Sequence, residues 1–406
     1  MTSELLILTP SAVALAADSA VTIGDKKTYN GVNKLFMLSN NPPIGIMTYN
    51  IANFLNIPLE TIIKEFRNNL SPNINSLYDL SEEFNHFLEE VVKDSVNKES
   101  FDEKLKYFIE ILKIESEKFN IDEFKRIVAL DVDNFNESEL GEHHEQICSK
   151  LEEQEELFDV FIQEIEDEDE KNEFLSNLKK FFINKIFLDP FIGIVIAGFD
   201  NKKLFPSFIH FKINYLYGNN FILNIIDEDE IGKTRVILKP FAQGDVINTF
   251  LSSIDIETKC AIVKYFATVQ QNYINDIKEA IKENNKINGK DEIQVLNEIS
   301  KIELQNENLV ESFSDFIESL KKEHSQPIID SIAYLPKEEL SNLAESLIKI
   351  TSLKIKVQKD LETVGGPVDV AIITKGDGFV WTKRKHYFDA SLNPQFFNRK
   401  KLKHNI

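Results

Sequence analysis

The sequence predicts an α+β protein in which blocks of strands alternate with blocks of helices. Short apolar runs separated by turn signals indicate strands near the N-terminus, after residue 187 and again after Gly365-Gly366. Between these blocks lie stretches rich in Glu, Asp and Lys, with few Gly and Pro and with apolar residues at helical intervals. With 406 residues the chain can form one large core with sizeable insertions.

The first 34 residues hold the most informative pattern. Thr2, Asp18 and Lys34 are spaced at equal intervals of sixteen residues. Met1 precedes a small residue, so we expect an aminopeptidase to remove it and to leave Thr2 as the N-terminus. Thr2 then has a hydroxyl nucleophile and a free α-amine, whose ordinary pKa of roughly 7.7–8.0 suits a general base near neutral pH. A lysine and the carboxylate that holds it complete the set.

The surrounding pattern places these residues at the ends of strands. Two strand-like runs, SELLIL and AVALAA, are separated by a Thr-Pro-Ser turn signal, and Asp18 ends the second run. Lys34 opens the next apolar run, and residues 44–47 predict a short buried strand. The helical pattern that follows has a break or a new start at Pro58.

In this region the sequence resembles the proteasome β-subunit family and its bacterial ring-protease relatives, which are N-terminal-nucleophile hydrolases. That family has a processed N-terminal Thr, an Ala-Ala-Asp or Ala-Gly-Asp at a strand end, a Thr-x-Gly and a following Lys at these spacings. The matching residues, without a gap, are Thr2, Ala17-Asp18, Thr22-Ile23-Gly24 and Lys34. The resemblance covers roughly half of the chain, about residues 2–66, 187–272 and 340–385.

The resemblance implies a four-layer α/β/β/α sandwich of the N-terminal-nucleophile (Ntn) hydrolase type, with two stacked mixed sheets between helices and with helical insertions. It also implies a threonine protease that cleaves peptide or amide bonds and forms a homo-oligomer. Thr2, Asp18 and Lys34 would be its catalytic residues. A positively charged Lys34, held by Asp18, would favour the neutral form of the amine by like-charge repulsion.

The same resemblance suggests supporting residues in the first and second parts of the core. A backbone N–H near Asn50 would hold the oxyanion; the family usually has Gly there, and Asn also tolerates a positive φ. Gln243 would stand where the family has a serine that assists the N-terminal amine. A bulkier amide cannot pass on a proton as a hydroxyl does, so this difference bears on activity.

A third region would close the site around the N-terminus. The family has Asp-x-x-Ser-Gly-Gly there, and Gly365 is present in this chain. Val364 stands where Ser is expected, and Asp360 is one residue early. Asp360 or Glu362 could supply the carboxylate, and Thr363 could supply the hydroxyl.

The predicted organisation alternates core segments with insertions. The expected segments are a first core part at 1–70, an acidic helical insertion at 71–186, a second core part at 187–274, a helical insertion at 275–334, a third core part at 335–390 and a basic C-terminal tail at 391–406. In the second insertion, Asn288-Gly289 predicts the turn of a helical hairpin.

The acidic insertion has an apolar helix face and one cluster of metal-type residues. The face is expected to share five residues, Leu151, Phe158, Phe161, Ile162 and Ile165, opposite the carboxylates. The segment GEHHEQIC at 141–148 lacks the second His of an HExxH helix and has no CxxC partner elsewhere. We interpret it as surface polar residues and expect neither a metal nor a cofactor.

Composition excludes several classes of function. The net charge of −21 argues against a nucleic-acid partner. Two cysteines form no disulfide framework, which favours the reducing cytoplasm. The N-terminal segment has Glu4 and no Lys or Arg before Lys26, unlike a secretory signal. No run reaches the ~20 apolar residues of a membrane span, so we expect a cytoplasmic protein without a membrane partner.

Three functions remain open at this point. The first is a self-assembling threonine peptidase that acts on a peptide or protein and works with an unfoldase partner. The second is a small-amide hydrolase of the same fold. The third is a non-catalytic scaffold or binding protein, favoured by Gln243 and Val364 in place of hydroxyls. A scaffold does not need Thr2, Asp18 and Lys34 together, so we expect the peptidase.

Overall fold

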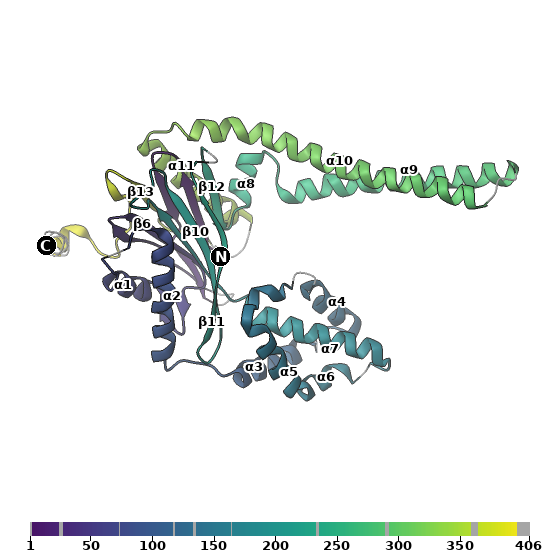
Figure 1. Cartoon of the computed structure of the whole chain (residues 1–406), viewed down its shortest axis with the longest axis horizontal. Coiled ribbons are helices and arrows are strands. Elements are labelled where there is room, and N and C mark those ends of the chain that lie inside the picture. The colour runs from purple at the N-terminus through teal and green to yellow at the C-terminus, as the bar shows by residue number, and fades with distance from the viewer. Residues whose placement is uncertain are drawn as a thin grey trace.

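The structure is a computed structural model. It describes residues 2–23, 27–72, 74–116, 118–132, 135–163, 165–232, 235–288, 292–358 and 364–395. Two five-stranded sheets form its core, and helices pack around and project from them (Figure 1). This arrangement confirms the predicted α+β class.

The first sheet joins both ends of the chain and has the strand order β12-β1-β2-β13-β14. Its strands are β1 (Ser3–Leu8), β2 (Val13–Ala17), β12 (Ile237–Ala242), β13 (Asp369–Thr374) and β14 (Gly378–Lys383). The residues from Ser3 to Leu8 are all buried, because β1 has a neighbour on each side and is covered on both faces. The first residues of the chain therefore lie in the middle of the protein's core.

The second sheet has the order β11-β10-β9-β6-β5. Its strands are β5 (Leu35–Asn40), β6 (Pro43–Asn50), β9 (Ile192–Gly198), β10 (Ser207–Tyr217) and β11 (Asn220–Glu230). The near-continuous apolar run at 192–198 is the fully buried central strand, as predicted. Two short hairpins lie outside both sheets: β3 (Ala20–Ile23) with β4 (Lys27–Asn30), and β7 (Asn53–Phe54) with β8 (Ile57–Pro58).

Every strand pairing in the two large sheets is antiparallel, so the expectation of mixed sheets is wrong. The physical reason is the length of the connections. Short turns join β1 to β2, β5 to β6 and β13 to β14, and a parallel pair would need a crossover of a dozen or more residues.

The two sheets stack face to face around one apolar layer. On β1, Leu6 and Leu8 belong to the layer between the sheets, whereas Leu5 and Ile7 pack against helices. Side chains alternate between the faces of a strand, so Glu4 lies in phase with Leu6 and faces the layer between the sheets.

Helices cover the outer face of each sheet. Helices α1 (Leu59–Asn68) and α2 (Leu77–Asp94) pack on β5, β6, β9 and β10, and α1 begins directly after Pro58, as predicted. On the other side lie α8 (Asp245–Ser252) and α11 (Lys337–Gln358). Although α2 falls in the range expected for the acidic insertion, its Leu80, Phe84 and Leu88 are buried against the core.

A bundle of helices follows α2 and has its own apolar cluster. It comprises α3 (Phe101–Ser116), α4 (Ile121–Val132), the short helix η1 (Glu137–His143), α5 (His144–Glu153), η2 (Glu155–Phe158), α6 (Asp159–Ile162), α7 (Glu168–Ile183) and the π-helical turn η3 (Asn184–Leu188). The five apolar residues expected on one helix face are all buried here. They do not share one helix, because α5 ends at Glu153 and Gln154 is not helical (φ −121°, ψ 22°).

A long helical hairpin forms the second projection (Figure 1). It consists of α9 (Ile256–Asn288) and α10 (Glu292–Ile332), so α9 begins within the range expected for the second core part. The rings of Phe266 and Phe313 stack across the pair with centroids 4.1 Å apart. Gly289 of the predicted turn lies outside the described residues, as do residues 396–406 of the basic tail after η4 (Ala390–Leu392).

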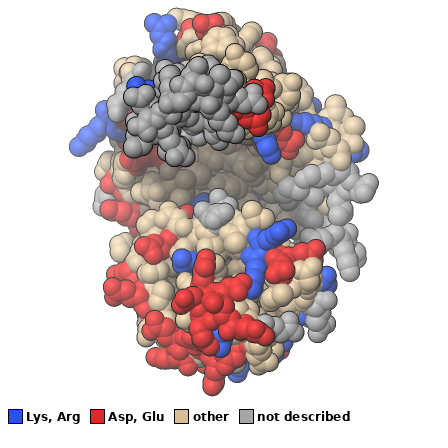
Figure 2. Space-filling view, turned by 90° about the vertical axis from the view of Figure 1, so that its right-hand side faces the viewer, with Lys and Arg blue, Asp and Glu red and all other residues tan. Residues whose placement is uncertain are grey.

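The hairpin and the bundle project from the same side of the sheets, and the N-terminal end of the chain lies on that side (Figure 1). Seen from there, the surface is deeply hollowed between the two projections, and carboxylates gather on the bundle (Figure 2). Within the part of the chain that the structure describes, no helix has the length and apolarity needed to cross a membrane.

Candidate active site

Thr2 lies immediately before β1 and is held at both its backbone and its side chain. Its carbonyl oxygen accepts a hydrogen bond from the Gln243 backbone N–H at 3.1 Å, at the end of β12. Its hydroxyl donates to Oε2 of Glu4 at 3.1 Å, and the residue is 3% exposed. The hydroxyl of the predicted nucleophile therefore lies in a buried polar cluster.

Asp18 follows β2 and connects three segments of the chain. One carboxylate oxygen accepts the Ser3 N–H at 3.2 Å. The other accepts the N–H of Ala20 at 3.3 Å and that of Gly365 at 2.9 Å. Because the carboxylate is fully buried, these hydrogen bonds and its ion pair with Lys34 offset the cost of removing it from water.

Lys34 reaches the same cluster from the second sheet, where it directly precedes β5. Its ammonium pairs with Asp18 and lies 3.7 Å from Oε1 of Glu4, and its side chain is 5% exposed. The Thr48 N–H donates to the Lys34 carbonyl oxygen at 2.9 Å, which fixes the backbone from which the side chain extends. The fold thus brings Thr2, Asp18 and Lys34 into one cluster, although they are spaced sixteen positions apart in the sequence.

Glu4 is the site residue that sequence reasoning missed. It is fully buried, and its Oε1 has no hydrogen-bond partner among the described residues. Burial raises the pKa of its carboxyl to about 8, against a lowering by Lys34 and a further rise due to Asp18. A signal was present: an acidic residue at an alternate position of an otherwise apolar strand has no stabilising role in a core.

A neutral hydrogen-bonded pair lies beside this cluster. Tyr49 Oη and His210 Nε2 are 2.7 Å apart, and both residues are buried. Burial lowers the pKa of His210 to about 4, so its ring is uncharged at neutral pH. Burial, together with the charge of Glu4, raises the pKa of Tyr49. The Tyr49 ring lies 5.9 Å, between centroids, from the ring of Phe241, which is the strand partner of Glu4. Gly193 lies opposite Tyr49 on β9. A side chain there would clash with the Tyr49 ring, because its Cβ atom would lie only 2.1 Å from the ring, so this position requires glycine.

The supporting residues lie at different distances from Thr2. Gln243 bonds Thr2 through its backbone, as described above. Asn50 ends β6 and has a positive φ of 70°, the conformation that was predicted to be tolerated there. Its side-chain amide donates to the Phe191 carbonyl oxygen at 3.0 Å, and no hydrogen bond between the described residues joins Asn50 to Thr2.

The third predicted region reaches the site through its glycine. Gly365 bonds Asp18 through its N–H, and its carbonyl oxygen accepts the Ser19 N–H at 3.1 Å. Val364, which stands where a serine was expected, is fully buried. Asp360, Glu362 and Thr363 lie outside the described residues.

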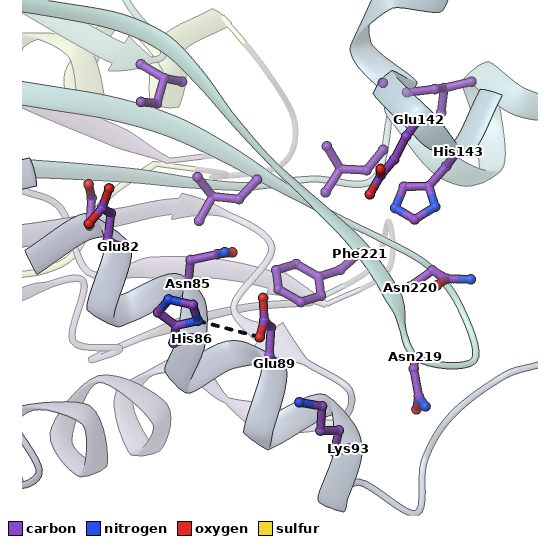
Figure 3. A pocket seen from close by; sticks show the side chains of 16 residues that line it. Glu82, Asn85, His86, Glu89, Lys93, Glu142, His143, Asn219, Asn220 and Phe221 are labelled. Carbon is purple, nitrogen blue, oxygen red and sulfur yellow. Dashed lines mark ion pairs between the residues drawn. The ribbon is translucent and has the colours of Figure 1, made fainter. Parts of the chain in front are cut away.

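A groove of about 790 Å³ lies elsewhere, between α2, η1, β11 and the turn before β11 (Figure 3). Glu82 and the ion pair of His86 with Glu89 (3.6 Å) lie on one wall, with Glu142 and His143 across from them. Thr2, Glu4, Asp18 and Lys34 are not among its lining residues. Among the described residues, no group of three or more His, Cys, Asp or Glu side chains converges as a metal site.

The high pKa of Glu4 predicts how stability depends on pH. Between its ordinary pKa of 4.5 and about 8, the folded protein keeps a proton on Glu4 that the unfolded chain releases. The contribution of this proton to the stability of the folded protein is therefore fully present below pH 4.5 and is lost as the pH rises through about 8. We expect the thermal midpoint of the wild type, measured relative to Glu4→Gln, to fall across this window. A constant difference would contradict the raised pKa, and Glu345→Gln on α11 is the control.

Comparisons with known proteins give no family. No family model matches the chain, and no curated protein matches it. Similar solved structures include Anbu (ancestral beta-subunit) from Yersinia bercovieri, with 10% identity, a TM-score of 0.32, and coverage of 99% of this chain and 95% of that one. The helical assembly of the Anbu complex from Pseudomonas aeruginosa has 10% identity, a TM-score of 0.36, and coverage of 99% and 94%. A Gly-1 mutant of Anbu from Hyphomicrobium has 9% identity, a TM-score of 0.33, and coverage of 100% and 97%.

The expected membership of the proteasome β-subunit family is wrong, because no family model and no curated relative supports it. The similar structures are Anbu proteins, and their low TM-scores establish neither a shared fold nor a shared function. The matching residues end at Lys34, too short a stretch to define a family for a chain of 406 residues. The roles of Thr2, Asp18 and Lys34 therefore depend on their own geometry.

Proposed function

We propose that this chain, once Met1 is removed, hydrolyses amide bonds with Thr2 as its nucleophile and that its substrate is a peptide. The observation that supports this most is the cluster of one ammonium and two carboxyl groups beside the second residue of the chain, whose hydroxyl bonds one of them. Lys34, Asp18 and Glu4 come from three strand ends and are all buried. Buried charges in such an arrangement are costly and are typical of functional sites.

The chemistry follows from having a hydroxyl and an amine on one residue. Oγ1 of Thr2 attacks the carbonyl carbon, the amine of the substrate leaves, and water then hydrolyses the ester on Thr2. The α-amine of a processed Thr2 is a base within the same residue. The positive charge of Lys34 opposes a second positive charge on that amine. Backbone N–H groups near Asn50 are the candidates for holding the oxyanion.

We also assign the core to the four-layer α/β/β/α arrangement of the Ntn-hydrolase type. The stacking of the two sheets supports this, as do α1 and α2 on one outer face and α8 and α11 on the other. The hollow between the two projections lies on the N-terminal side of the sheets (Figure 2). A homo-oligomer stays a prediction.

A second candidate is a non-catalytic scaffold. Two observations favour it: Thr2 is only 3% exposed in the chain that begins with Met1, and Val364 replaces a hydroxyl. A scaffold and a hydrolase differ in one measurable property, the reactivity of Thr2 toward an electrophile.

The experiment uses a peptide vinyl sulfone on the full chain, with intact mass and peptide mapping as readouts. We expect the purified protein to lack Met1 and to gain one adduct at Thr2, which Thr2→Ala abolishes and Thr2→Ser retains. Thr268→Ala, on the exposed face of α9, is the matched control and should react as the wild type does. A retained Met1, or its loss without an adduct, would support the scaffold instead.

A further inference from the structure

Glu4 occupies a position where a carboxylate is costly. Its neighbours on the adjacent strands are Ala17 on β2 and Phe241 on β12, and both belong to the apolar layer between the sheets. The rest of that face of β1 consists of Leu6 and Leu8. A fully buried acid in such a layer lowers stability unless another group offsets its desolvation.

The contacts of Glu4 divide between its two oxygens. Oε2 accepts the hydrogen bond from the Thr2 hydroxyl at 3.1 Å. Oε1 has no hydrogen-bond partner among the described residues and lies 3.7 Å from the Lys34 ammonium. The carboxyl group thus makes its one hydrogen bond to the reacting oxygen and lies within ion-pair distance of a cation.

Holding Lys34 does not explain Glu4, because Asp18 already does so. The Asp18 oxygens accept Lys34 Nζ and the N–H groups of Ser3, Ala20 and Gly365. Asp18 therefore anchors Lys34 and the surrounding backbone, whereas the contact that distinguishes Glu4 is with the Thr2 hydroxyl.

We propose that Glu4 is a catalytic residue that moves the proton of the Thr2 hydroxyl, an inference that rests on the proposed function. The Glu4 carboxylate accepts the Oγ1 proton as Oγ1 bonds to the substrate carbonyl carbon. It then gives this proton to the departing nitrogen as the C–N bond breaks. In the second half of the reaction it takes a proton from water as the oxygen of that water attacks the ester. It returns that proton to Oγ1 as the ester bond breaks.

The charged and titratable groups around Glu4 suit this role. Lys34 before β5 stabilises the carboxylate, and Asp18 after β2 destabilises it. Tyr49 on β6 lies in the same layer between the sheets, and His210 on β10 forms a hydrogen bond with it. With burial as the largest effect, the pKa of Glu4 is about 8, close to the value at which a general base is most effective.

The test measures the rate of adduct formation at Thr2 with a peptide vinyl sulfone as a function of pH. Glu4→Gln keeps the size of the side chain and an oxygen that can accept the Thr2 hydrogen bond, but it cannot take up the proton. We expect it to lower the rate by about 10²–10⁴-fold and to remove the rise near pH 8. The control is Glu345→Gln, which changes an ion-paired carboxylate of α11 far from Thr2 in the sequence. It should leave the rate of adduct formation and its dependence on pH unchanged.

Other outcomes separate the two proposals. A folded Glu4→Gln protein that reacts at the wild-type rate, with the same rise near pH 8, would show that the α-amine alone is the base. Wild-type protein without a Thr2 adduct would overturn the proposed function, and the role of Glu4 would fall with it. If Glu4→Gln does not fold, infrared difference spectra of the wild-type protein, recorded before and after adduct formation, test the role of Glu4 instead. Adduct formation removes the hydroxyl donor and should shift the carboxyl band of Glu4, and an unchanged band overturns the proposal.

Discussion

Replacing Lys34 with methionine is expected to lower the free energy of unfolding by about 3–5 kcal/mol, the range for breaking a buried ion pair. The substitution keeps most of the apolar stem but leaves the buried Asp18 carboxylate without its cation, and it removes the ammonium near Glu4. It should also abolish adduct formation at Thr2. Chemical unfolding curves measure the first effect, and mass spectrometry measures the second.

An exposed lysine provides the matched control for Lys34. Lys337 pairs with Asp377, but both side chains are 55% exposed. Solvent screens such a pair, so Lys337→Met should cost about 0–1 kcal/mol. If Lys34→Met destabilised the protein as little as Lys337→Met does, the buried cluster would not have the electrostatic importance assigned to it.

Asp18→Ala is expected to cost at least about 3 kcal/mol, because it breaks the ion pair with Lys34 and leaves buried N–H groups without acceptors. The affected donors are those of Ser3, Ala20 and Gly365. Since Gly365 belongs to a segment far along the chain, its backbone should lose protection against hydrogen exchange. Deuterium uptake in the peptides covering residues 3–8 and 364–374 measures this directly.

The control for Asp18 is an exposed aspartate with local partners only. Asp389 accepts hydrogen bonds from Ser391 and Asn393 within one turn, and Asp389→Ala should change neither stability nor exchange in those peptides. Unchanged uptake at residues 364–374 in Asp18→Ala would contradict the role of Asp18 in joining the third region to the N-terminus.

Local sequence patterns were sufficient to place the three central residues. Thr2, Asp18 and Lys34 each lie at the end of a recognisable apolar run, and the short turn between β1 and β2 brings the first two ends together. The buried strand at 192–198 and the helix after Pro58 were equally local, and both are confirmed. These features depend on neighbours in the sequence.

Features that depend on distant parts of the chain were not predictable in the same way. β1 pairs with β12, and this pairing brings Gln243 to Thr2. Helix α2 resembles the acidic helices that follow it, and only its contact with the second sheet assigns it to the core. The family assignment failed because it extended a short match near the N-terminus to about half of the chain.

Glu4 was missed for a different reason. Its strand is predicted by the apolar run, whereas its burial follows only from the alternation of faces along that strand. Once Leu6 is placed between the sheets, Glu4 must lie there too, next to the residue that precedes the strand. A buried charge of this kind is the sequence signal to look for.

The most direct test of Thr2 as an N-terminal nucleophile is its reaction with a peptide epoxyketone. This reagent closes a ring when one residue offers both a hydroxyl and a neighbouring free amine, and mass spectrometry of the N-terminal peptide detects the doubly linked product. We predict that the wild-type protein forms this ring at Thr2. A wild-type protein that keeps Met1, or that forms no ring with Met1 removed, would contradict the central claim.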